Sequence, residues 1–156
     1  MDTLVVGITG FLVTQDVSTS TPMSLTTTAQ KVVFTTVNSA TTDATQITID
    51  ASKDTILVTD NVKGYNVVAN FSVEGLADKT TSTVFCELFA DGVLIDSCTH
   101  SIYSYACACF TAQKYVVIDP GDEPETLTIK LTETAGSCQM NSVQLRVQTN
   151  YTVAAV

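Results

Sequence analysis

Apolar and polar residues alternate along much of this 156-residue chain, and no stretch repeats at the helical period. The clearest alternation covers residues 65–74, 127–132 and 143–153. In the first segment, Phe71 falls among the apolar positions and Ser72 among the polar ones. A period of two places successive side chains on opposite faces of a strand, and one buried face with one solvated face is typical of antiparallel sheets. The pattern therefore predicts an all-β fold.

Turn residues divide the chain into short strands, which is the pattern of two packed sheets. The expected strands are residues 31–37, 45–49, 55–59, 62–74, 83–90, 93–100, 103–111, 113–118, 126–134 and 142–153. Residues 1–28 are expected to form an N-terminal arm or strand extension. Residues 29–156 are expected to form one β domain, because a chain of this length is long enough for a single core.

The dipeptide Asp91-Gly92 lies between two apolar runs and predicts a two-residue hairpin turn. Counting outward from that turn places Cys86 opposite Ser97 and puts Cys98 on the other face of the sheet. We therefore expect no disulfide between Cys86 and Cys98, although a three-residue loop in place of the two-residue turn would reverse this conclusion. The chain has five cysteines, an odd number, and we expect them to be free thiols because no secretion signal is recognisable.

The charge of the chain excludes two classes of partner. Its formal net charge is −9 and its pI is about 4.2, so it has no basic footprint for nucleic acid or for an anionic membrane surface. The first residues are apolar, but they open with Met1-Asp2 and are interrupted by Gly7 and Gly10, which argues against a signal peptide. With 45% hydrophobic and only 15% charged residues, part of the surface is expected to face another subunit.

Candidate catalytic groups are few and lack partners. His100 is the sole histidine, and no Gly-x-Ser-x-Gly motif accompanies it, so a Ser-His-Asp triad is not expected. Glu87 and Asp96 fall opposite each other in the predicted hairpin, as the two carboxyl groups of a retaining glycosidase do. The chain has no Trp to stack on a sugar, so we expect no enzyme and no catalytic residue. An enzyme that acts on polysaccharide is kept as the least favoured hypothesis.

Metal ligands are also incomplete. Cys107 and Cys109 share one face of an expected strand, but nothing nearby completes a tetrahedral zinc site. Apolar residues on both faces of that strand favour the core or a subunit interface instead. The carboxylates between Asp119 and Glu125 lack the spacing of an EF-hand, so a solvated turn is expected there. We therefore expect no metal and no cofactor.

The order of features along residues 26–153 resembles the tumour-necrosis-factor/C1q-type jelly roll. Thr26–Thr35 leads to two short strands, Gly64-Tyr65 opens a long strand, Asp91-Gly92 turns a hairpin, and a final long strand contains Tyr151. The resemblance implies a two-sheet antiparallel sandwich that assembles as a homotrimer. An immunoglobulin-like sandwich is the alternative fold.

Within that family the chain is similar to small bacteriophage virion proteins. A short segment before the domain favours a capsid decoration (cement) protein, made in the host cytoplasm, that binds the major capsid protein on the surface of the virion. The alternative is the receptor- or glycan-binding head of a phage fibre, whose partner would be a glycan of the host surface. The residues expected in the core or at the trimer interface are Tyr65, Phe71, Tyr105 and Tyr151.

Overall fold

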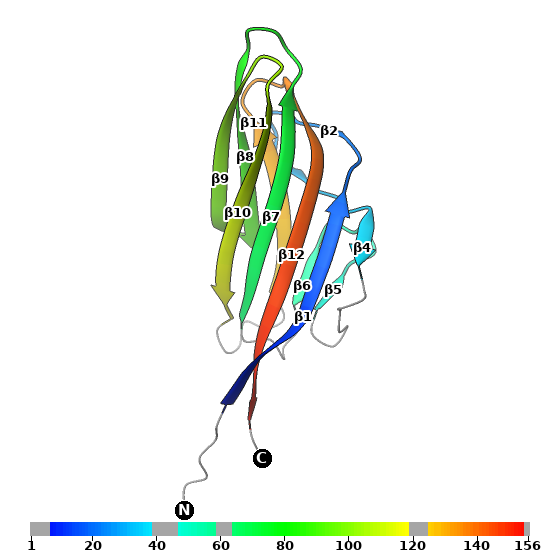
Figure 1. Cartoon of the computed structure of the whole chain (residues 1–156), viewed down its shortest axis with the longest axis vertical. Coiled ribbons are helices and arrows are strands. Elements are labelled where there is room, and N and C mark those ends of the chain that lie inside the picture. The colour runs from blue at the N-terminus through cyan, green and yellow to red at the C-terminus, as the bar shows by residue number, and fades with distance from the viewer. Residues whose placement is uncertain (1–6, 39–46, 59–63, 119–124, 155–156) are drawn as a thin grey trace, which may run out of the picture.

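The protein is an elongated sandwich of two antiparallel sheets, seen in a computed structural model (Figure 1). The structure describes the backbone of residues 7–38, 47–58, 64–118 and 125–154, and the side chains of residues 19–37, 48–58, 64–118 and 125–148. Every pairing of strands in these residues is antiparallel. The prediction of an all-β, two-sheet fold is confirmed.

Sheet A contains the first and the last strand of the described chain. Its strands are β1 (Gly7–Thr19), β2 (Met23–Ser24), β4 (Thr36–Asn38), β7 (Gly64–Gly75), β10 (Cys107–Val117) and β12 (Cys138–Ala154). They follow the order β10–β7–β12–β1–β4, and β2 pairs with the first residues of β12.

Sheet B packs against sheet A. Its strands are β3 (Gln30–Lys31), β5 (Ile47–Ile49), β6 (Ile56–Val58), β8 (Thr81–Ala90), β9 (Val93–Tyr103) and β11 (Glu125–Glu133). They follow the order β5–β6–β11–β8–β9, and β3 pairs with β11. The two sheets therefore end side by side, with β10 as the last strand of sheet A and β9 as the last strand of sheet B (Figure 1).

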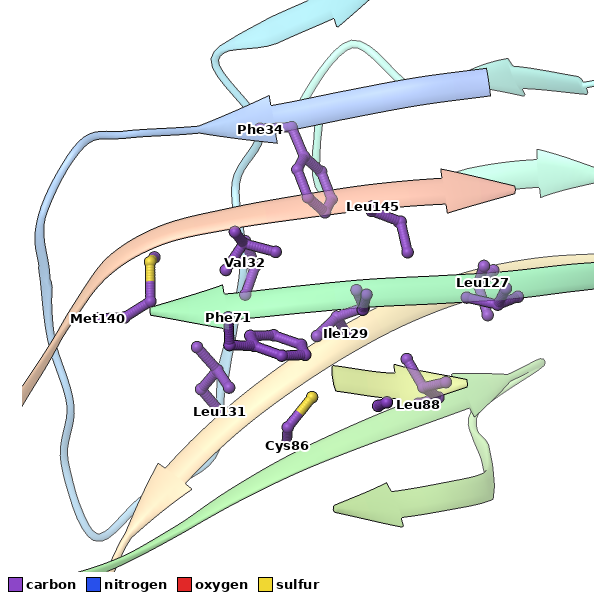
Figure 2. Close-up of a cluster of buried hydrophobic side chains, with 14 of the residues drawn as sticks. Val32, Phe34, Phe71, Cys86, Leu88, Leu127, Ile129, Leu131, Met140 and Leu145 are labelled. Carbon is purple, nitrogen blue, oxygen red and sulfur yellow. The ribbon is translucent and has the colours of Figure 1, made fainter. Parts of the chain in front are cut away.

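The core forms because the period of two turns one face of each central strand inward. Burial alternates along β8 and β11 residue by residue, as the sequence pattern predicts. Figure 2 shows the inward side chains of β7 and β12 directed toward those of β8 and β11. The labelled members of this cluster are Val32, Phe34, Phe71, Cys86, Leu88, Leu127, Ile129, Leu131, Met140 and Leu145.

The segment 1–28, expected as an arm or strand extension, contributes β1 and β2 to sheet A. β1 pairs with β12 from Gly7–Ala154 to Thr19–Val143, and with β4 near its end. The pairing of β7 with β12 ends at Gly64–Asn150. Beyond that pair, the first residues of β1 and the last residues of β12 pair only with each other and continue as a two-stranded ribbon beyond the sandwich (Figure 1). The strand that opens the chain is thus an integral part of sheet A.

The hairpin at Asp91-Gly92 forms as predicted, but its register changes two residues from the turn. Phe89 pairs with Leu94 and Leu88 pairs with Asp96, so Ile95 is an extra residue in β9. Such a β-bulge shifts all later pairs by one residue. The predicted register is therefore wrong beyond the bulge.

Two consequences of the bulge overturn earlier expectations. Cys86 lies directly opposite Cys98, so the two cysteines share a face of the sheet rather than opposite faces. Glu87 lies opposite Ser97, so the carboxylate pair with Asp96 that a glycosidase would need does not form.

The expected strand over residues 103–111 is interrupted by a tight turn. Ser104 has a φ of 55°, in the left-handed region, and Ala106 donates its N–H to the carbonyl of Tyr103 at 3.2 Å. This turn lies against Gly75, where an added Cβ would come within 1.8 Å of the Ser104 carbonyl oxygen. β10 then runs unbroken to Val117, where the sequence had suggested two strands.

Candidate functional site

The candidate catalytic and metal-binding residues are dispersed. The described residues include no group of three or more His, Cys, Asp or Glu side chains that could hold a metal ion. The ring of His100 stacks on Phe110 with 5.6 Å between ring centroids, and Phe110 stacks on Phe71 at 5.3 Å. Phe71 and Phe110 are paired within sheet A, so the stacking of His100 from β9 on Phe110 is the contact that joins the two sheets here.

Two glutamates face inward at the two ends of β11. Glu125 is 7% exposed and accepts a hydrogen bond from the hydroxyl of Tyr65. Glu133 is 1% exposed and accepts hydrogen bonds from the hydroxyl of Ser82 and, at 3.0 Å, from the backbone N–H of Cys138. Buried carboxylates need such donors because an unpartnered charge in the interior is very costly.

The structure corrects the expectation for one end of the acidic loop. Residues 119–124 lie outside the described residues, but Glu125 is buried rather than part of a solvated turn. Its position could have been found in the sequence, because Glu125 and Glu133 share the parity of the inward residues Leu127 and Leu131. The burial of Tyr65, together with its hydrogen bond to Glu125, raises the pKa of that hydroxyl far above its usual range.

The five cysteines are free and occupy three kinds of environment. Cys86 and Cys138 are buried, Cys98 is half-buried, and Cys107 and Cys109 are exposed on β10. Burial is the main cause that raises the pKa of the Cys138 thiol to about 11. Burial likewise raises the pKa of Cys86 well above its usual range, so neither buried thiol is a ready nucleophile at neutral pH.

The β9–β10 edge carries most of the exposed large apolar side chains among the described residues. We use this name for the outer side of the two strands at which both sheets end, together with the turn between them (Figure 1). The large apolar side chains exposed there are Val93, Leu94, Tyr103, Tyr105, Tyr115 and Val117. Val33 and Leu76 are the other exposed large apolar residues among the described side chains.

The outer face of sheet A is polar but carries few charges. Its described side chains on β7 and β12 are mostly amides and hydroxyls, among them Asn70, Ser72 and Gln144, and Thr111 of β10 donates a hydrogen bond to Asn70 at 2.7 Å. A shallow hollow of about 280 Å³ lies there. Its lining residues are Asn70, Phe71, Ser72, Cys109, Phe110, Thr111, Ser142 and Gln144.

The four residues expected in the core or at a trimer interface do not gather at one place. Tyr65 and Phe71 are 0% and 2% exposed in the core of the protomer. Tyr105 is 64% exposed in the turn after β9, next to the end of β7, whereas Tyr65 lies at the start of β7. Tyr151 belongs to β12, opposite Gly10 of β1, and its side chain lies outside the described residues.

This architecture matches a known domain. The globular domain of the zebrafish complement 1qA protein is similar in structure with a TM-score of 0.54 and 11% sequence identity, over 85% of this chain and 94% of that domain. No model of a known protein family matches the chain, and no curated protein matches its sequence. At this identity the similarity shows the fold alone. The protein has a C1q/TNF-like jelly roll, as the resemblance implied.

The comparison does not extend to a bacteriophage origin or a virion role, which stay predictions. Within the described residues, no helix is long and apolar enough to cross a membrane.

Proposed function

We propose that the protein is a non-enzymatic structural protein that assembles as a homotrimer and, as a decoration protein, binds the major capsid protein of a bacteriophage head. The observation that supports the homotrimer is the apolar β9–β10 edge. The capsid-binding role is supported only by the resemblance to small virion proteins drawn from the sequence, and the described residues include no group of His, Cys, Asp or Glu side chains that could hold a catalytic metal.

The β9–β10 edge needs a cover for two reasons. Each of its strands has eleven residues and is the last strand of its sheet, so no other strand of the described residues pairs with the outer backbone groups. Long exposed edges of this kind promote uncontrolled pairing unless they are protected. The apolar side chains of Val93, Leu94 and Val117, each about half exposed or more, add an area that water solvates poorly. Burial against a second copy removes both problems.

A suitable partner surface is the outer face of sheet A in the next copy. The described side chains of this face include only Glu74 and Arg146 as charged residues, although the chain carries a net charge of −9. Uncharged amides and hydroxyls can be buried with hydrogen bonds at a much smaller desolvation penalty than charged groups. An edge that packs on the face of a neighbour is a heterologous contact, which closes into a ring when the rotation fits. The resemblance to the C1q-type jelly roll implies a homotrimer, so we propose a ring of three copies.

Sedimentation equilibrium tests the assembly. We expect the wild-type protein to have three times the protomer mass of 16.6 kDa. Val117→Asp, which places a charge at the 64%-exposed edge position, should shift the mass toward one protomer. Val33→Asp is the matched control, because Val33 is 51% exposed away from this edge and should leave the mass unchanged. A wild-type protein that stays at 16.6 kDa at high concentration would refute the trimer.

Capsid binding is tested separately with lattices of a phage major capsid protein. The wild-type trimer should co-sediment with the lattice at saturable stoichiometry and raise its melting temperature. A trimer of the correct mass that does not bind any such lattice would remove the decoration role and leave the assembly intact.

A second function, the glycan-binding head of a fibre, is favoured by the hollow on sheet A. Amides and hydroxyls such as Asn70, Thr111 and Gln144 are groups that hydrogen-bond sugar hydroxyls. A glycan array with specific hits that Asn70→Ala abolishes would support this function. If the protein binds the capsid lattice and the glycan array gives no hits, the result would favour the decoration role over the fibre head.

A further inference from the structure

Cys86 and Cys98 are direct cross-strand partners in the β8–β9 hairpin. Opposite residues of an antiparallel pair have Cα atoms about 4.5 or 5.5 Å apart, and disulfides span Cα separations of roughly 4.4–6.8 Å. Both side chains pack on the hydrophobic core, Cys86 fully buried and Cys98 partly so. In the described pairings the other cysteines lie opposite Glu74, Ser72 and Gly75, so this is the one opposed pair.

We propose that Cys86 and Cys98 form a site of reversible oxidation, in which a low-molecular-weight disulfide such as oxidised glutathione converts the free pair to an intrachain disulfide. The inference does not rest on the proposed trimer or on capsid binding. The hairpin register that makes it possible comes from the bulge at Ile95, without which Cys86 would face Ser97.

The exposure of the two thiols sets the order of the steps. Cys98 is the more accessible, so its thiolate attacks one sulfur of oxidised glutathione. The glutathione S–S bond breaks, one reduced glutathione leaves, and a mixed disulfide remains on Cys98. The Cys86 thiolate then attacks the Cys98 sulfur and releases the second reduced glutathione. The two protein thiols lose two electrons and two protons, and one oxidised glutathione becomes two reduced molecules.

The second step is the slow one at neutral pH. Burial is the main cause that raises the pKa of Cys86, and Cys98, Asp96 and Glu87 disfavour its thiolate further. The thiolate fraction of a group below its pKa rises about tenfold per pH unit. Ring closure should therefore accelerate steeply with pH as long as the fold is retained.

The position of β9 allows the closure. Opposite Cβ atoms lie about 4.5–5.5 Å apart, and a disulfide needs about 3.8 Å, so the strands must approach by roughly 1 Å. β9 is the last strand of sheet B and is bonded to β8 along one side, so it can shift more easily than a central strand. The disulfide would fix this edge strand, and the bulged register, to the rest of the sheet.

The experiment uses the full chain with Cys107→Ser and Cys109→Ser, which removes the two exposed thiols that would compete for glutathione. Folded protein is incubated with oxidised glutathione, quenched in acid, alkylated after unfolding and mapped by mass spectrometry. We expect a linked peptide that contains Cys86 and Cys98, while Cys138 remains alkylated. The wild-type chain should show the same link beside glutathione adducts on its exposed cysteines.

Single substitutions separate the two steps. With Cys86→Ser, Cys98 should accumulate a stable glutathione adduct, and with Cys98→Ser, Cys86 should stay free. The proposal is overturned if both thiols of the folded wild-type protein stay free under conditions that fully modify Cys107 and Cys109. It is also overturned if the link forms only in denaturant, or if Cys86 links to Cys138 instead.

Discussion

Replacement of Tyr65 by Phe tests how the buried glutamates are held. The substitution keeps the aromatic ring in the core and removes only the hydroxyl that donates to Glu125. Tyr65 is 0% exposed and Glu125 is 7% exposed, so water cannot readily replace the lost donor. The carboxylate then keeps its burial but loses a hydrogen bond to a charged group.

The expected loss follows from that geometry. A hydrogen bond to a charged group contributes about 1.5–3 kcal/mol to stability. For a chain of this size each kcal/mol corresponds to roughly 2–4 °C, so Tyr65→Phe should lower the melting temperature by roughly 3–12 °C. The free energy is measured by urea unfolding and the melting temperature by thermal unfolding, both at neutral pH, with all variants at one protein concentration because assembly adds to apparent stability.

A double-mutant cycle with Glu125→Gln isolates the pair, and we expect a coupling free energy above about 1 kcal/mol. Tyr103→Phe is the matched control, because Tyr103 is 57% exposed and its variant should stay within about 0.5 kcal/mol of the wild type. Equal stabilities of Tyr65→Phe and the wild type would show that the hydroxyl does not support the buried carboxylate.

Three further outcomes are expected from the same core. Ser82→Ala should lower the free energy of unfolding by about 1–3 kcal/mol, measured in urea, because Glu133 loses a buried donor. Gly75→Ala should abolish folding or shift the register, seen by circular dichroism, because its Cβ would meet the Ser104 carbonyl at 1.8 Å; normal melting would contradict this. Above pH 9 stability should fall, because the Cys138 thiol ionises near its ordinary value of 9.0 in the unfolded chain but only near 11 in the folded one. Its contribution is complete below pH 9 and lost as the pH rises toward 11, so Cys138→Ala should show a shallower decline in urea unfolding across that range.

The sequence pattern predicts the long strands well. Strict alternation over residues 65–74 and 143–153 places β7 and the second half of β12, because one buried face leaves little freedom of register. The dipeptide Asp91-Gly92 locates the β8–β9 hairpin, because these residue types favour the positive φ angles that a two-residue hairpin turn requires. The jelly-roll order of these strands came from the resemblance rather than from periodicity.

The features that the sequence did not predict depend on single residues. The bulge at Ile95 needs only a local backbone change between two apolar residues, and it reverses the relation of Cys86 to Cys98. The turn at Ser104 lies between stretches that both alternate, so the pattern gave no sign of its left-handed backbone, which places the Ser104 carbonyl against Gly75 and donates the Ser104 N–H to the Thr80 carbonyl. Tyr105 was consequently expected in a strand but lies in an exposed turn.

Hydrogen exchange at high and low protein concentration tests self-assembly through the β9–β10 edge most directly. We expect amides of β9 and β10, and those of the outer face of sheet A, to exchange more slowly in the concentrated sample, while those of β11 change little. Identical exchange at the edge in both samples, with a protomer mass throughout, would contradict it.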